Sequence, residues 1–222
     1  TEDIVPYVSY STSFFPILDA DSGTGQPFKP ETGRQTEVGF RHQPDQGKFG
    51  YSVAFYDLRR QNYVTSDPET LRNRQTGEVT ARGLEFEGLL KPTPSLNILA
   101  SYTLSLKSEI TKSSDPSEIG KPIKGTPKHQ FNIWSDYKTP VGVKLGIGVR
   151  YKGSHHGDLD GSPAKVPSYA LYDARVSYDY QNWNFAISGR NITNKRTLAF
   201  CANWACGYGE KRRIMATATA NW

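Results

Sequence analysis

The chain has 222 residues, a formal net charge of +5 and a mean hydropathy of −0.61. No apolar run approaches the roughly 18 residues that a transmembrane helix needs, which excludes a helical membrane span. The positive charge is dispersed, with its longest cluster at Lys211–Arg213, and so it forms no arm of the kind that binds nucleic acid.

Ten segments alternate apolar and polar residues with period two, the pattern of β-strands that have one apolar face. In chain order they are Asp3–Phe14, Arg34–Gln43, Lys48–Thr65, Val79–Lys91, Ser95–Glu109, Lys128–Lys138, Val143–His155, Tyr169–Tyr180, Trp183–Asn194 and Arg212–Trp222. A strand of a membrane barrel needs only about 10 alternating residues, and a polar lumen lowers the average hydropathy. The composition is therefore compatible with a membrane barrel.

The seventh segment shows the two faces clearly. Leu145 and Ile147 fall on one face, whereas Lys144 and Arg150 fall on the other. The last segment alternates in the same way and ends on the aromatic Trp222. The pattern predicts strands that present one face to an apolar environment and the other to a polar one.

The connections between segments are short and long by turns. The short ones, rich in Pro, Gly, Asn and Asp, are Pro44–Gly47, Pro92–Pro94, Thr139–Gly142 and Gln181–Asn182. The long polar ones are Phe15–Gly33, Ser66–Glu78, Ile110–Pro127, His156–Ser168 and Lys195–Lys211. This arrangement places all short turns at one end of the sheet and all long loops at the other, as in outer-membrane barrels.

Aromatic residues near the segment ends fit a girdle at the turn-side interface. They are Tyr51, Tyr137, Tyr180, Trp183 and Trp222. A soluble β-sandwich or β-solenoid also alternates, but its strands usually have only about 5–6 residues. Strand length and the two-sided loop pattern together favour an all-β, transmembrane antiparallel β-barrel.

Several stretches occur in an order that resembles the TonB-dependent siderophore receptors. They are Val5–Pro16 followed by Phe28–Phe40, Arg82–Gly88, Gly125–Trp134, Gly189–Lys195 and the terminal strand that ends in an aromatic residue. Cys201–Gly209, followed by the Ala-Thr-Ala-Thr strand, looks most like the ferrichrome-type hydroxamate receptors. The resemblance covers essentially the whole chain.

The resemblance implies a barrel of about 22 strands whose lumen holds an N-terminal plug domain. We therefore expect residues 1–222 to be about ten C-terminal strands of such a barrel, without the plug and the earlier strands. The implied protein is not an enzyme and has no cofactor; it takes up a ferric siderophore, whose iron is only part of the ligand. Its implied partners are that siderophore, outer-membrane lipid, and the TonB complex, which would act through the missing N-terminal region.

The same resemblance places the chain in the bacterial outer membrane as a multi-pass protein. The long loops are then extracellular and the C-terminus is periplasmic. Two alternatives stay open: a self-contained ten-stranded pore, and an outer-membrane protease that uses His155, His156, Asp158 or Asp160. Adjacent residues of a strand point to opposite faces, and a solvated loop is the simpler interpretation of these four residues.

The polar faces of the strands are unusually charged. The charges expected to face the lumen are Glu37, Arg41, Glu85, Glu87, Arg150, Asp173, Arg175 and Arg190. An unpaired buried charge is costly, so we expect these groups to pair with one another and with the plug. Simple hydration in a water-filled lumen is the alternative.

The last long loop contains the candidate ligand residues. Cys201 and Cys206 would face an oxidising exterior, where a disulfide persists, and two thiols are too few for a metal site. Tyr208, Phe200 and Trp204 would form an aromatic wall at the siderophore mouth, because a ferric hydroxamate is bulky and partly apolar. Loop packing or an interfacial belt would equally account for any one of these aromatics.

Overall fold

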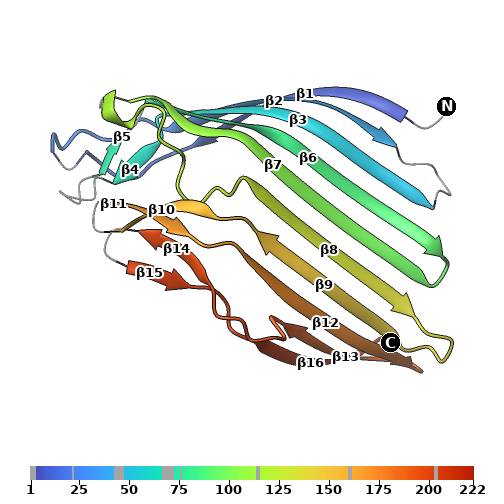
Figure 1. Ribbon diagram of the computed structural model, residues 1–222. Coiled ribbons are helices and arrows are strands. Elements are labelled where there is room, and N and C mark those ends of the chain that lie inside the picture. Colours follow the sequence, from blue (N-terminus) through green and yellow to red (C-terminus); the bar gives the residue numbers. More distant parts are fainter. Residues whose placement is uncertain are drawn as a thin grey trace.

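The alternating segments form one antiparallel sheet (Figure 1). The computed structural model describes residues 4–21, 23–42, 48–66, 73–75, 77–113, 116–159, 162–202 and 205–222. Within them, ten strands pair in the order β1-β2-β3-β6-β7-β8-β9-β12-β13-β16. Their bounds are β1 Ile4–Phe15, β2 Glu31–His42, β3 Phe49–Gln61, β6 Glu78–Thr93, β7 Leu96–Lys112, β8 His129–Lys138, β9 Lys144–Lys152, β12 Tyr169–Tyr180, β13 Trp183–Arg190 and β16 Arg213–Ala220.

Three small hairpins lie in the long loops, at the left of Figure 1. They consist of β4 (Val64–Ser66) with β5 (Asn73–Gln75), β10 (His155–Leu159) with β11 (Ser162–Val166), and β14 (Leu198–Ala202) with β15 (Ala205–Tyr208). A short 3-10 helix, η1 (Pro116–Glu118), lies in the β7–β8 loop. No helix among the described residues is long and apolar enough to cross a membrane.

The strand register places the apolar side chains on one face, because directly paired residues of antiparallel strands share a face. One such row crosses five strands and consists of Leu96, Tyr137, Leu145, Val176 and Ile187. Large apolar side chains of this face stay open to the surroundings: Leu145 is 44% exposed and Ile187 53% exposed. No second layer of protein covers them among the described residues, and the predicted alternation is confirmed.

The polar side chains lie on the other, concave face. There, large aromatic side chains lie across glycines of the neighbouring strand. A Cβ added at Gly148 would lie 2.3 Å from the ring of Trp134, and one at Gly146 would lie 2.5 Å from it. The indole nitrogen of Trp134 donates a hydrogen bond to Asp136 at 2.8 Å. The small residues of β9 thus seat an aromatic side chain flat against the concave wall.

The predicted alternation of short and long connections is also confirmed. The tight turns after β6, β8 and β12 lie at the right of Figure 1, together with the start of β1 and the C-terminus, and the long loops lie at the left. The predicted turn Pro44–Gly47 lies outside the described residues. Three predicted strands are too long at their loop ends, and one of them is Trp183–Asn194, because β13 ends at Arg190 and Asn191 takes a positive φ of 46°. β3 ends at Gln61 because Asn62 takes a positive φ of 59°, and β9 ends at Lys152, after which His155 begins a separate hairpin.

The sheet is open. Among the described residues, β1 and β16 each pair on one side only, and they do not pair with each other. The alternative of a self-contained ten-stranded pore is therefore wrong for this structure, because closure needs the first and last strands to share a ladder. The unpaired edges are those of a wall segment, as expected for part of a larger barrel.

Candidate functional site

The concave face holds an open groove with a volume of about 660 Å³. Its lining combines charged residues from several strands with apolar and aromatic ones. The charged residues of the lining include Arg41, Glu87, Arg150 and Asp173. Four of the predicted lumen charges therefore line a common surface, and two of them, Arg150 and Asp173, form a salt bridge.

Three predicted carboxylates lie on the strands β2 and β6. Glu37 accepts hydrogen bonds from the Tyr7 hydroxyl at 2.5 Å and from Gln35 at 3.2 Å. The guanidinium of Arg41 lies 5.9 Å from the centre of the Tyr7 ring. Within the part of the chain that the structure describes, Glu85 and Glu87 form no salt bridge.

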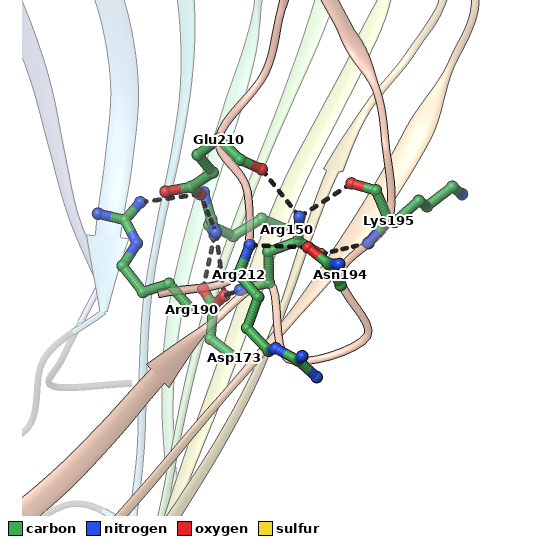
Figure 2. Close-up of polar contacts among 8 residues, drawn as sticks. Arg150, Asp173, Arg190, Asn194, Lys195, Glu210 and Arg212 are labelled. Carbon is green, nitrogen blue, oxygen red and sulfur yellow. Dashed lines mark hydrogen bonds and ion pairs between the residues drawn. The ribbon is translucent and has the colours of Figure 1, made fainter. Parts of the chain in front are cut away.

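Part of the expected charge pairing is present at the loop end of β9, β12 and β13 (Figure 2). Arg150 donates to both carboxylate oxygens of Asp173, at 2.6 and 3.0 Å. Arg150 also pairs with Glu210, which lies between β15 and β16, and Arg190 approaches the same Glu210 oxygen at 3.3 Å. Two predicted arginines thus converge on Glu210, which the sequence had not indicated, and one of them also holds the predicted Asp173.

Asn191 ties this cluster to the following loop. It is fully buried, with a positive φ of 46°. Its backbone N–H donates to Asp173 at 2.8 Å, and its side-chain amide donates to the carbonyls of Lys195 at 2.9 Å and Glu210 at 2.8 Å. The Lys195 N–H donates back to the Asn191 oxygen at 2.9 Å. One side chain therefore closes the turn after β13 and holds the segment that leads into β16.

A second asparagine, three residues later in the same loop, also bonds the backbone of the segment that leads into β16. Asn194 also has a positive φ, of 52°, and its side-chain oxygen accepts the N–H of Arg212 at 3.1 Å (Figure 2). Asparagine enters the left-handed region more readily than most residues, and its amide can bond the nearby backbone. The Gly189–Lys195 stretch is thus an anchor for the last long loop. The two asparagines, spaced three apart after a strand, were the signal for it in the sequence.

The last long loop is built as a hairpin. Cys201 and Cys206 face each other across β14 and β15 and form a disulfide, with their Cα atoms 4.0 Å apart. Cys201 is buried against β10, where a Cβ added at Gly157 would lie 2.8 Å from the Cys201 carbonyl oxygen. The β14–β15 and β10–β11 hairpins therefore pack together at the long-loop end of the sheet (Figure 1).

His155 lies within this pair of hairpins. It is only 3% exposed, and its two ring nitrogens face the backbone carbonyls of Gly153 and Ala199, each at 3.3 Å. The histidine of the protease alternative is thus used in packing the two hairpins. The side chain of Asp158 and all of Asp160 lie outside what the structure describes. Among the described residues, no three His, Cys, Asp or Glu side chains come together as metal ligands.

Two of the three predicted aromatic ligands can be placed. Phe200 is 54% exposed and Tyr208 is 76% exposed, both on the disulfide hairpin. The Phe200 ring lies over the paired Gly207, where an added Cβ would come within 2.5 Å of the ring. The third, Trp204, lies outside the described residues. Arg175, the remaining predicted lumen charge, lies on the concave face of β12 with no salt bridge in the described part of the chain.

An open antiparallel wall with one exposed apolar face and long loops at one end has the architecture of a segment of an outer-membrane barrel. The family described as "TonB dependent receptor-like, beta-barrel" matches residues 1–192. The chain belongs to this family of outer-membrane receptors, as the sequence resemblance predicted.

Several curated relatives are siderophore receptors by name. The chain is 34% identical to the ferrichrome outer membrane transporter/phage receptor of Escherichia coli K12, over 97% of this chain and 30% of the relative. It is 31% identical to the ferrioxamine B receptor of Salmonella typhimurium, over 97% of this chain and 32% of the relative. The chain thus spans about a third of the length of the curated relatives that it matches.

Solved structures agree with this fold. The siderophore receptor PiuA of Acinetobacter baumannii superposes with a TM-score of 0.77 at 26% identity, over 98% of this chain and 34% of PiuA. The ferric-catecholate import receptor Fiu of E. coli K12, in its closed form, gives a TM-score of 0.76 at 25% identity, over 98% of this chain and 33% of Fiu. By name, these relatives are receptors and transporters, and none is an enzyme.

Proposed function

We propose that the chain is the C-terminal barrel wall of a receptor that imports a ferric siderophore with energy from TonB. The observation that carries this proposal is the 34% identity to a ferrichrome transporter across 97% of the chain. The ferrioxamine receptors among the relatives favour a hydroxamate ligand. Iron enters this scheme as part of the siderophore and not as a cofactor of the protein.

In this scheme the long loops face outward and the C-terminus faces the periplasm. Tyr208 and Phe200 stand exposed on the hairpin that the Cys201–Cys206 disulfide closes. We propose that they contact the siderophore together with Trp204, and that the disulfide holds them at the mouth. The charges of the concave face would meet the plug domain, which would be supplied by the rest of the receptor.

The test uses the full receptor in cells that lack their own siderophore receptors. We expect uptake of iron-55 from ferrichrome or ferrioxamine B, and we expect uptake to stop when TonB is deleted. A ferric catecholate serves as the matched ligand of another class. Uptake of the catecholate but not of the hydroxamates would contradict the ligand class, and uptake without TonB would contradict the mechanism.

The orientation has its own test. A peptide tag inserted after Gly25, in the β1–β2 loop, should bind antibody on intact cells, because that loop lies at the long-loop end. A tag inserted between Gln181 and Asn182 should bind only after the outer membrane is opened. The reverse pattern would overturn the proposed orientation.

A further inference from the structure

The convex face has a sharp boundary between apolar and charged rows. The last apolar row on the first strands is Val8, Val38, Phe55 and Leu84. The next row toward the long loops is Tyr10, Thr36, Asp57 and Arg82, and the one after it is Thr12, Arg34, Arg59 and Thr80. A lipid-facing surface tolerates charge only where the hydrocarbon ends, so the boundary marks the headgroup level of one leaflet.

The charges of these rows are not balanced. Arg59 and Arg82 share the single carboxylate of Asp57, at 3.2 and 2.6 Å. Arg34 lies directly across from Arg59 in the β2–β3 ladder, and like charges that face each other across strands repel. Arg34 has no hydrogen-bond or ion-pair partner among the residues that the structure describes. With three arginines and one aspartate, this cluster has an excess of positive charge.

The cluster surrounds a shallow cavity with a volume of about 450 Å³. Its lining residues are Tyr10, Arg34, Thr36, Asp57 and Arg59. The side chain of Arg59 is 39% exposed, and Tyr10 is 67% exposed. Guanidinium groups present planar pairs of N–H donors that match phosphate oxygens, and a tyrosine at this depth suits the membrane interface.

We propose that this cavity binds the phosphate of a lipid headgroup in the leaflet on the long-loop side. Arg34 and Arg59 would share the phosphate, which removes their mutual repulsion, while Arg82 keeps Asp57 neutralised. A lipid fits better than a soluble anion because Val38 and Phe55 lie on the same face, directly below the arginines, where acyl chains would run. The proposal rests only on the chain being part of an outer-membrane wall and not on the siderophore.

The test measures lipid binding to the full receptor by native mass spectrometry in detergent. The probe is lipid A with two phosphate groups, compared with the same lipid after its phosphates are removed. We expect the phosphorylated lipid to bind and the dephosphorylated one to bind at least several-fold more weakly. Arg34→Gln, which breaks no ion pair, should weaken binding about fivefold, and Arg34→Gln with Arg59→Gln about 25-fold.

The matched control removes two positive charges at the other end of the sheet. Lys48→Gln with Lys91→Gln, beside the turns, should leave lipid A binding unchanged, because these residues lie at the opposite membrane surface. Equal loss in the control and the arginine variants would overturn the site, as would unchanged binding in Arg34→Gln. Displacement of lipid A by millimolar inorganic phosphate would assign the cavity to a free anion instead. Siderophore uptake by the same variants is measured separately. The lipid site and the proposed function can therefore be contradicted independently of each other.

Discussion

Asn191 shows how a single polar residue positions the loop side of this wall. It takes a left-handed backbone conformation and is fully buried. A buried polar side chain is tolerated when its hydrogen bonds are made, and this one bonds Lys195 twice and Glu210 once. Its backbone also donates to Asp173, which holds Arg150. The residue thus joins β12, β13 and the last loop at one point.

Replacing Asn191 separates the contribution of its side-chain hydrogen bonds from that of its backbone conformation. In the full receptor, Asn191→Gly keeps the backbone conformation but loses three side-chain hydrogen bonds, and we expect a loss of about 1–3 kcal/mol in the stability of the barrel. Asn191→Ala adds backbone strain and should lose more. Thermal unfolding followed by circular dichroism measures both. Equal stability of wild type and Asn191→Gly would show that the side-chain bonds contribute nothing.

Tyr208 gives a prediction about ligand binding. Because its side chain is 76% exposed, replacing it disturbs little packing. Tyr208→Ala in the full receptor should weaken ferric-siderophore binding about tenfold or more, if the ring is a buried contact in the complex. Tyr180→Ala, an exposed tyrosine at the turn end, is the matched control and should leave affinity unchanged. Equal affinity of Tyr208→Ala and wild type would remove Tyr208 from the site.

At the scale of elements, the loop hairpins are the part of this fold that the sequence revealed least. The long strands could be predicted because a one-residue slip would turn every apolar side chain to the wrong face. For example, Tyr169–Tyr180 was predicted with the bounds that β12 has. The β10–β11 and β14–β15 hairpins have no lipid-facing side, so they carry no such alternation. His155 therefore looked like the end of a membrane strand, although it begins a hairpin.

The charged site could be predicted only in part for a related reason. Alternation assigns Arg150, Asp173 and Arg190 to the lumen face, and that face is where they lie. It says nothing about Glu210, which belongs to no strand and reaches the cluster through the loop anchor of Asn191. Contacts made by irregular segments depend on tertiary packing, and period-two patterns carry no information about them.

The disulfide hairpin gives a prediction at this scale. The Cys201–Cys206 bond closes a loop with a sequence separation of only 5, so it constrains the unfolded chain little. Cys201→Ser with Cys206→Ser should therefore shift the unfolding temperature of the full receptor by no more than a few degrees. The same variant should weaken siderophore binding several-fold, because the disulfide no longer holds Phe200 and Tyr208 in one position. Reduction of the wild type with a thiol should reproduce the loss of binding, and a large fall in unfolding temperature would contradict this account.

At the scale of the whole molecule, the open sheet explains why the concave charges are unevenly satisfied. Near the loops, Arg150 and Arg190 neutralise Asp173 and Glu210. Farther from the loops, Glu85 and Glu87 of β6 have no salt bridge in the described part of the chain. Charges on a wall that encloses a lumen need water or a partner, because an uncompensated charge is costly once solvent is excluded. The plug of a TonB-dependent receptor would be such a partner.

Charge reversal tests whether the plug supplies that partner. In the full receptor, Glu87→Lys places a positive charge in the groove where a carboxylate stood. If basic groups of the plug face this position, repulsion should loosen the plug, lower siderophore uptake several-fold and make cells more sensitive to a large hydrophilic antibiotic. Glu109→Lys makes the same charge change on the convex face of β7, where it removes only a partly exposed ion pair with Lys107. Uptake and antibiotic sensitivity should stay at wild-type levels in that control, and a Glu87→Lys receptor that matches it would show that water alone satisfies the wall.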